Sequence, residues 1–378
     1  MEAIARDQLL LARFQRHDLH RSPGELASCT ELGLLDQGVQ DTGGDGAPWA
    51  LAIRGAPPAA EGDLVYAWTL RGAPHAYRRT DAAGVAVATA PWSEADAAKR
   101  VFDASRPLKA AGIPVLDALR TVAEQARAIV ERPTVKGELS RRLTEVLDEP
   151  YLRWCRPCQA IHAYEQPFRL AALQAGLELE PGTSPPVLRR IPRLRPNLLG
   201  RLGDDAPAHL DVVRGHLRFY PGAGPKDVAG HVDAPVKEVK VRWPDDAVEV
   251  AIAGAGGEAS GWVLAEDLDA VQAAAPTGAV RLLGPYDPYL QARDRWLLVD
   301  DPTRAKGLWP VLGRPGAVVV DGEVVGTWRP RTTGKRLTVN VEPWARLPRP
   351  LQDAVDAEAE RLAQHRGVTL AEVAMTWR

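Results

Sequence analysis

The spacing of hydrophobic and polar positions changes several times along the chain and divides it into four segments. In the first segment, apolar residues three and four positions apart predict a helix at 7–14. Residues 22–25, Ser-Pro-Gly-Glu, have the form of a second helix start with Pro just inside it, and 45–54 predict a third helix. The β-branched and aromatic residues of 64–70 and the return at 75–79 predict two strands joined by a turn.

The same order of helices followed by paired strands recurs twice. The second segment predicts helices at 114–131, 134–147 and 159–176, the last ending at Gly176 as a C-cap, and then an extended, Pro-rich stretch at 177–196. The third segment predicts helices at 206–220, 225–231 and 236–241, followed by a hairpin of 248–253 and 261–264. Helices followed by a β-hairpin, about three times over, are typical of winged-helix units.

The fourth segment changes to short strands, which are predicted at 280–283, 317–328 and 335–341. Asp321-Gly322 between two apolar runs is a strong hairpin signal, and an amphipathic, acidic helix is predicted at 351–365. We therefore predict an α+β protein of three tandem winged-helix units with a small C-terminal β-barrel and a closing helix. The expected boundaries are 1–92, 93–205, 206–277 and 278–378.

Composition limits the classes of protein that this pattern can represent. The 378 residues are 45% hydrophobic and 25% charged, which is ordinary for a folded globular protein. The net charge of −2 excludes a wholly basic coat for nucleic acid. No stretch approaches the roughly 18 apolar residues of a membrane span, the N-terminus lacks the features of a secretory signal, and three cysteines make no disulfide framework. We expect a cytoplasmic monomer without a membrane partner.

Local charge is less even than the total. Residues 31–63 contain six acidic residues and a single base, Arg54, which would repel a phosphate backbone unless the acids point elsewhere. Residues 181–201 contain no acid and five arginines: Arg189, Arg190, Arg193, Arg195 and Arg201. This second stretch is the best candidate for binding phosphate. The alternative is a solvated linker in an arginine-rich chain.

Several motifs resemble the winged-helix DNA glycosylases of the AlkZ/YcaQ type. The C-terminal signature consists of 286–290, 293–295, 309–310 and 320–329, and 68–75 resemble the Arg-Gly-Thr-x-His strand of that family. The resemblance extends from about residue 5 to 366. It implies three winged-helix units around a C-terminal β-barrel, and an enzyme that removes alkylated or bulky-adduct bases from duplex DNA.

The resemblance also implies a catalytic tripeptide, Gln-apolar-Gln or Gln-apolar-Asp. The matching residues are Gln40, Asp41 and Thr42, followed at the expected distance by Arg54, which we expect to contact DNA. Thr42 therefore takes the place of the second catalytic residue. The pKa of its hydroxyl is far too high for the group to ionise at neutral pH, so Thr42 cannot act as a base. Asp41 could supply a carboxylate, although backbone alternation would point it away from Gln40.

The remaining DNA contacts implied by the resemblance lie in the first strand pair. Arg71 and His75 are expected to line the site, with Arg71 holding a phosphate or orienting Gln40. Asp287, Arg293 and Asp294 of the C-terminal signature are expected to join the barrel to the helical units through charged hydrogen bonds. A non-catalytic, regulator-like DNA-binding protein that has lost the second catalytic residue is the main alternative.

Cys155, Cys158 and His162 form the sharpest local motif. Two thiolates and an imidazole at this spacing supply three of the four ligands of a tetrahedral zinc ion, with Glu165, Cys29 or His75 as candidates for the fourth. The same Cys-x-x-Cys suits a redox pair, or two buried small residues at a helix start. No cofactor is required for base excision, so a structural zinc would fit a third alternative, a protein-interaction module.

Overall fold

The computed structural model describes residues 3–194, 205–254 and 259–377, which form a mixed α/β structure. The first elements are β1 (Ala3–Ala5), α1 (Arg6–Arg16), β2 (Val39–Gln40), α2 (Gly46–Ala52), β3 (Leu64–Trp68), β4 (Pro74–Arg78), α3 (Ala82–Thr89) and α4 (Glu94–Arg100). Next come α5 (Ser105–Ala110), α6 (Val115–Ile129), β5 (Thr134–Val135), α7 (Lys136–Val146), β6 (Leu152–Cys155), β7 (Ala160–Ala163), α8 (Glu165–Gln174), β8 (Leu177–Leu179) and β9 (Val187–Arg190).

The second half of the chain begins with three helices and a hairpin. Its elements are α9 (Val212–Phe219), α10 (Pro225–Val232), α11 (Val236–Val241), β10 (Ala247–Ala253), β11 (Ala259–Leu264) and α12 (Leu268–Ala273). The C-terminal elements are β12 (Val280–Leu283), α13 (Arg295–Leu298), α14 (Pro302–Leu308), β13 (Gly316–Val320), β14 (Glu323–Thr333), β15 (Arg336–Pro343), α15 (Arg349–His365) and β16 (Thr369–Met375).

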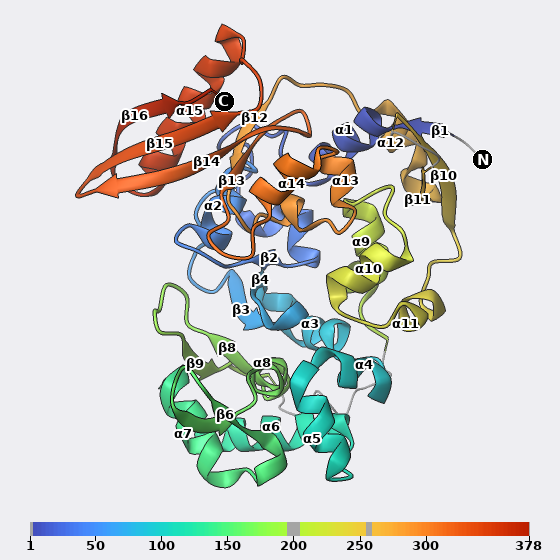
Figure 1. Ribbon diagram of the computed structural model, residues 1–378, viewed down its shortest axis with the longest axis vertical. Coiled ribbons are helices and arrows are strands. Elements are labelled where there is room, and N and C mark those ends of the chain that lie inside the picture. Colours follow the sequence, from blue (N-terminus) through green and yellow to red (C-terminus); the bar gives the residue numbers. More distant parts are fainter. Residues whose placement is uncertain (1–2, 195–204, 255–258, 378) are drawn as a thin grey trace.

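A six-stranded sheet joins the first two segments of the chain. Its order is β2-β4-β3-β8-β9-β5, so strands from the first and second predicted units lie in one sheet. The two halves meet at a single pair, Tyr66 of β3 with Leu179 of β8. In Figure 1 these strands lie between the C-terminal sheet and the helices α5–α8. The sheet thus holds Gln40 on its first strand and the arginines of β9 on its fifth.

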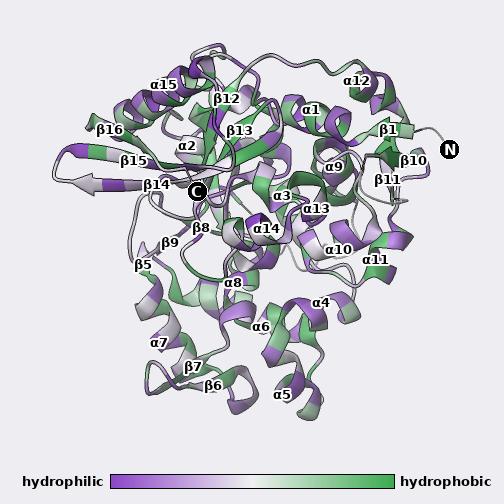
Figure 2. Cartoon of the chain, turned by 45° about the horizontal axis from the view of Figure 1, so that its top comes forward, coloured by the Kyte–Doolittle hydropathy of each residue, from purple (hydrophilic) through white to green (hydrophobic). Residues whose placement is uncertain are grey.

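The C-terminal strands form an open sheet, which corrects the expectation of a closed β-barrel. The order is β12-β13-β14-β15-β16, with β12 and β16 at the two edges and no pairing between them among the described residues. β16, which the pattern did not predict, runs parallel to β15. The hydrophobic colouring of β12 and β13 in Figure 2 agrees with their buried side chains, which pack beside α15.

The hairpin of the third predicted segment, residues 206–277, forms a three-stranded sheet with the N-terminal strand β1. β1 pairs in parallel with β10, which forms the predicted hairpin with β11. An isolated antiparallel bridge joins Ala223 to Trp262 of β11. Both ends of the chain therefore contribute to the folded core, because a single large cluster of buried residues includes α1, α2, β10 and the C-terminal sheet.

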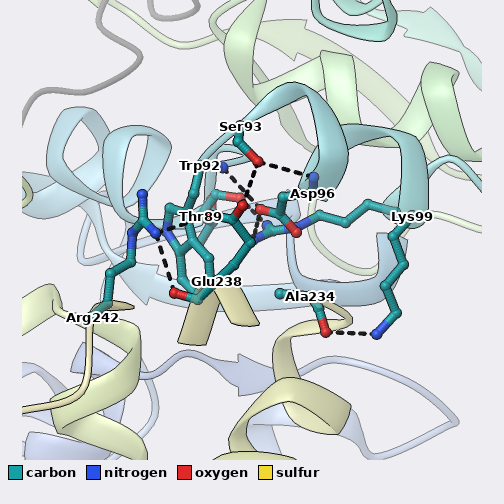
Figure 3. A network of polar contacts seen from close by, with 9 residues as sticks. Thr89, Trp92, Ser93, Asp96, Lys99, Ala234, Glu238 and Arg242 are labelled. Carbon is teal, nitrogen blue, oxygen red and sulfur yellow. Dashed lines mark hydrogen bonds and ion pairs between the residues drawn. The ribbon is translucent and has the colours of Figure 1, made fainter. Parts of the chain in front are cut away.

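Polar contacts join the second unit to the third, as Figure 3 shows. Ser93 Oγ lies 2.9 Å from Glu238 Oε1, and Lys99 donates from Nζ to the Ala234 carbonyl at 2.6 Å. The Arg242 guanidinium carbon lies 4.8 Å from the centroid of the Trp92 ring. These contacts hold α11 and the residues that flank it against α4 and the residues just before α4.

Three of the predicted helices differ from the structure. Residues 22–25 form a turn, because Gly24 takes a left-handed φ of 71° that ends the helical path. The helix predicted at 159–176 starts only at Glu165, since the residues before it pair as the β6–β7 hairpin. The helix predicted at 206–220 is reduced to α9, which begins where Asp211 caps the amides of Val213 and Arg214.

No helix among the described residues is long and apolar enough to cross a membrane.

Candidate active site and nucleic-acid interface

Gln40 lies at the end of the short edge strand β2. Its backbone pairs with His75 of β4, and its side chain is only 8% exposed. The side-chain amide donates from Nε2 to the Thr42 hydroxyl at 3.0 Å. The carbonyl oxygen Oε1 is buried and has no hydrogen-bond partner among the described residues. A buried acceptor without a partner carries a large desolvation cost, so Oε1 is suited to hold a ligand or a water molecule.

Thr42 and Asp41 differ in what their side chains do. Thr42 fixes the side-chain amide of Gln40 by accepting its N–H, so the carbonyl faces the opposite way. Asp41 accepts the amide N–H of Ala47 at 2.9 Å and thereby closes the loop before α2. Burial raises the pKa of the Asp41 carboxyl, and this side chain lines neither of the cavities described below. The carboxylate is therefore turned away from Gln40.

An open cavity of about 380 Å³ lies beside Gln40, which is a suitable size for a small organic group. It is enclosed by the start of α2, the loop after β12 and the strands β13 and β14. Trp49, Tyr286 and Trp328 contribute aromatic surface. The indole N–H of Trp49 donates to the Leu282 carbonyl, and that of Trp328 donates to the Leu283 carbonyl, each at 2.8 Å. The rings are therefore fixed in position as walls of the cavity.

A second, much smaller cavity lies on the other side of Gln40. Its volume of about 20 Å³ has room for one water molecule. Four of the residues that line it have buried polar atoms without partners in the described part of the chain: Gln37 Nε2 and Oε1, Gln40 Oε1, His231 Nδ1 and Gln291 Nε2. Such a set of donors and acceptors is what a buried water needs. Of the residues that the structure describes, Gln40 alone lines both cavities.

Arg71 and His75, which the family resemblance placed at the site, also line the small cavity. His75 is buried, and its Nδ1 lies 2.9 Å from the Ala73 carbonyl oxygen and 3.0 Å from Thr69 Oγ1. Burial, with a contribution from Arg71, lowers the pKa of His75 to about 3, so the ring is neutral at physiological pH. Because the Ala73 carbonyl can only accept a hydrogen bond, we place the proton of the neutral ring on Nδ1 and the lone pair on Nε2.

The guanidinium of Arg71 donates to the carbonyl of His231 and has no carboxylate within ion-pair distance in the described part of the chain. Arg71 itself takes a left-handed φ of 58°. Burial, with repulsion from Arg293, lowers the pKa of Arg71 to about 10, which still leaves it charged at neutral pH. A charged, half-buried arginine without a counterion is a candidate for an anionic ligand.

Three further arginines, near Arg71 and the rim of the larger cavity, were not predicted from the sequence as DNA contacts. Within the described residues Arg293, Arg295 and Arg314 have no ion-pair partner, and burial lowers the pKa of the first two, that of Arg295 to about 10. The guanidinium carbon of Arg314 lies 5.3 Å from the centroid of the Tyr286 ring, at the rim of the larger cavity. Arg293 and Arg295 lie in the C-terminal signature, where Arg293 was expected to have a structural role, but nothing in the sequence singled out Arg314.

Arg54, in contrast, is not available to DNA, which corrects its predicted role. Its side chain is completely buried, and it forms a bidentate ion pair with Asp287, both N···O distances being 2.8 Å. It also donates to the backbone carbonyls of His17 and Ala50. Asp294 pairs in the same way with the buried Arg13 of α1. These two aspartates therefore join the C-terminal signature to the N-terminal helices, as expected.

The fold neutralises two of the six acids in the stretch at 31–63. Asp36 pairs with Arg78, and Asp45 pairs with Arg366 at the rim of the larger cavity. Both bases come from elsewhere in the sequence. The local count of acids therefore overstates the negative charge that a phosphate backbone would meet at Gln40.

The predicted arginine stretch lies on and after β9. Arg189 pairs with Glu178 at 3.1 Å, and Arg190 donates to the Arg127 carbonyl at 2.8 Å. Arg193 is exposed, whereas Arg195 and Arg201 lie outside the described residues. Four strand-to-strand steps separate β9 from β2, which corresponds to roughly 19 Å across the sheet. Arg189 and Arg190 therefore belong to the same sheet as Gln40 but not to the same site.

Cys155, Cys158 and His162 come together at the end of the β6–β7 hairpin, where their ligating atoms lie within 4.8 Å of one another. Cys158 is exposed and Cys155 half-buried, so the interpretation as two buried residues at a helix start is wrong. Hydrogen bonds from Cys158 and His162 lower the pKa of the Cys155 thiol to about 7. Neither Cys29 nor His75 belongs to this group.

Comparison with known proteins identifies the family. A family model described as DNA glycosylase AlkZ-like matches residues 48–365, a range that begins after Gln40, Asp41 and Thr42. Among solved structures, the DNA glycosylase AlkZ of Streptomyces sahachiroi has a similar fold, with a TM-score of 0.70 and 20% sequence identity over 100% of both chains. A comparison with curated proteins found no match. The chain therefore belongs to the family of AlkZ-like DNA glycosylases.

Proposed function

We propose that this protein removes alkylated or bulky-adduct bases from duplex DNA by hydrolysing the N-glycosidic bond. The observation that carries the proposal is the position of Gln40. Gln40 lines both a cavity of a size that suits a nucleobase and a polar cavity with room for one water molecule, and its Oε1 has no hydrogen-bond partner among the described residues. Enzymes that act on a base take it out of the stack into such a pocket.

In the proposed reaction the damaged base lies in the larger cavity, against Trp49, Tyr286 and Trp328. Gln40 Oε1 accepts a hydrogen bond from a water molecule and holds it towards C1′ of the sugar. The C1′–N bond breaks, and its electron pair leaves with the base. The water oxygen then forms the new bond to C1′ and loses its proton to solvent.

The proposed substrates follow from the lack of a free carboxylate. Among the described residues that line the larger cavity, Asp45 and Asp287 are both paired with arginines. An amide does not deprotonate water strongly, so the leaving group must depart readily. A purine alkylated at N3 or N7 carries a positive charge and leaves as a neutral base. We therefore propose cationic alkylpurines rather than neutral lesions as substrates.

DNA binding is proposed to use two groups of arginines. Arg71, Arg293 and Arg314, near the small cavity and the rim of the larger one, would hold the phosphates next to the extruded nucleotide, while Arg189–Arg195 would hold a more distant part of the duplex. Arg71 and the arginines of β9 would belong to the first two of three winged-helix units, whereas Arg293 and Arg314 lie in the C-terminal segment that follows these units. In each of the three units, a short strand or bridge before the last helices pairs with the second strand of the hairpin: β2 with β4, β5 with β9 and Ala223 with Trp262.

The first experiment measures the release of base from a duplex that carries N7-alkylated purine. We expect release by the wild type, a loss of at least a hundredfold in Gln40→Ala, and a smaller loss in Asp41→Asn, because Asp41 acts only through the loop before α2. The exposed Gln364→Ala serves as the matched control.

Binding of the same duplex is measured in parallel over a range of salt concentrations. Salt-sensitive binding without base release by the wild type would overturn the enzymatic proposal in favour of a non-catalytic DNA-binding protein. Neither release nor binding would favour a protein-interaction module.

A further inference from the structure

The β6–β7 hairpin carries the strongest cluster of metal-ligating side chains outside the proposed active site. We propose that Cys155, Cys158 and His162 bind one Zn²⁺ ion at the end of this hairpin. The pairing of Arg153 with His162 and of Cys155 with Ala160 brings the imidazole close to the two thiols. This site is independent of the proposed base excision.

The distances fit a tetrahedral zinc ion. Zn–S bonds of about 2.3 Å and Zn–N bonds of about 2.0 Å separate neighbouring ligand atoms by roughly 3.5–3.8 Å. The three ligating atoms already lie within 4.8 Å of one another, so small side-chain rotations are enough to close the site. Both thiols belong to one tight turn, which the hairpin holds in place.

The turn between the two cysteines has the geometry that a metal-bound thiolate needs. Gln159, directly after the second cysteine, takes a left-handed φ of 51°. The amide N–H of Cys158 donates to the sulfur of Cys155. Such amide donors stabilise a thiolate and hold it in position for a metal.

Packing gives no other reason for these two cysteines. Cys29 is buried in the main core, with 1% of its surface exposed, whereas Cys158 is exposed at the end of the hairpin. The neighbouring Trp154 and Ile161 are 59% and 56% exposed. A hairpin with so little buried surface gains from a cross-link between its strands, and a zinc ion supplies one.

The fourth position is assigned to a water molecule. Cys29 lies in another core beside Asp63, and both His75 and Cys29 are outside the cluster. Glu165 follows β7 directly, but its carboxylate is held by Lys136 and Arg169, each at 2.6 Å. A zinc ligand would have to break these ion pairs. We therefore expect Glu165→Gln to bind as much zinc as the wild type.

The test measures the zinc content of the full-length protein after purification without chelators. We expect about one Zn²⁺ per chain in the wild type and in Cys29→Ser, the matched control for an unrelated cysteine. Cys155→Ser, Cys158→Ser and His162→Ala should each lose most of the metal. Cobalt substituted for zinc should give the thiolate charge-transfer band of a tetrahedral Cys-ligated site.

Two further measurements keep the outcome clear. Circular dichroism shows whether each variant is folded, since an unfolded variant would lose metal for another reason. In the wild type alone, titration of thiols before and after chelation should show that Cys155 and Cys158 react faster once zinc is removed. A metal-free wild type with two free thiols, or with a Cys155–Cys158 disulfide, would overturn the proposal, and the disulfide would favour a redox pair. Neither result depends on whether the protein releases bases.

Discussion

At the residue scale, the proposed site depends on which way a single amide faces. The Thr42 hydroxyl accepts from Nε2 of Gln40, and this bond leaves Oε1 directed away from Thr42. Thr42 takes the position at which the family resemblance implies a second glutamine or an aspartate. We therefore assign it a positioning role, because it acts on the water only through Gln40.

Replacing Thr42 by Val, which has nearly the same shape, removes this acceptor. A neutral hydrogen bond contributes about 0.5–1.5 kcal/mol, so we expect base release to slow by up to about tenfold. Thr42→Ser keeps the hydroxyl and should restore most of the rate, whereas duplex affinity should be the same in all three proteins. Equal rates for Thr42→Val and the wild type would show that the hydroxyl does not orient Gln40.

The Arg54–Asp287 pair illustrates the opposite case, in which a charged residue serves the fold alone. Both side chains are fully buried, so Arg54→Ala leaves Asp287 as an uncompensated charge. We expect it to lower the free energy of unfolding by about 3–5 kcal/mol, measured by urea denaturation. The control is Arg120→Ala, which breaks a pair with 45% and 55% of its side chains exposed and should cost less than about 1 kcal/mol. Similar losses in both variants would contradict this assignment.

At the scale of elements, the Asp321-Gly322 turn confirms the hairpin that the sequence predicted. Val320 pairs with Glu323, and the two turn residues have φ values of 45° and 93°. Positive φ at both central positions is typical of a type I′ turn, which is why the sequence signal was reliable. The turn also contacts α1 through Leu10, which lies against Gly322, and the Tyr289 hydroxyl donates to the Gly322 carbonyl at 2.7 Å.

Gly322→Ala should destabilise the protein for two reasons. The left-handed φ disfavours a side chain, and the added methyl group would lie 2.4 Å from the Leu10 carbonyl oxygen. Gly334 also has a positive φ, of 59°, but nothing lies within 4 Å of its added methyl group. We expect losses of about 2–4 kcal/mol for Gly322→Ala and about 1–2 kcal/mol for Gly334→Ala by chemical denaturation. Equal losses would mean that the contact with α1 relaxes freely.

Elements with a long periodic pattern were predicted well, and elements defined by distant partners were not. α6 buries Val115, Ala118, Leu119, Val122 and Ile129, which follow the helical spacing that predicted it. β1 and β16 are three and seven residues long and gain stability from parallel partners far along the chain, so local patterns gave no signal for them. β7 was mistaken for the start of a helix because it and its partner β6 are only four residues long.

The candidate site was predicted only in part, because some of its residues come together only in the tertiary fold. Gln40, Thr42, Arg71 and His75 were found through the family resemblance, and they lie around the two cavities. Gln291, His231 and the walls of the larger cavity come from segments that only the tertiary fold brings to Gln40. Arg54 illustrates the limit of spacing arguments, because sequence distance does not reveal whether a guanidinium faces solvent or a buried carboxylate.

At the scale of the whole molecule, four buried histidines link stability to pH. Burial is the largest cause that lowers the pKa of each of His17, His75, His216 and His231, that of His75 and His216 to about 3. In the unfolded chain each of them binds a proton near pH 6.5. The unfolded state therefore binds more protons below that pH, and the free energy of unfolding falls as the pH is lowered from about 6.5.

Each buried histidine contributes up to about 1.4 kcal/mol of lost stability per pH unit below 6.5. Urea denaturation at pH 7 and pH 5 measures this slope. His216→Asn should lower it by about one proton, whereas Gln364→Ala, which removes no ionisable group, should leave it unchanged. A wild-type protein of equal stability at both pH values would show that the histidines are already protonated in the fold.

The six-stranded sheet also sets a length. Roughly 19 Å across four strand spacings separates Gln40 from the arginines of β9. Base pairs rise by about 3.4 Å in duplex DNA, so this interval corresponds to five or six of them, about half a helical turn. Under the proposed DNA binding, a duplex that lies along the strand order meets Gln40 and the arginines of β9 about half a turn apart. One side of the double helix presents its minor and its major groove alternately at this interval, so the two contact points would face different grooves.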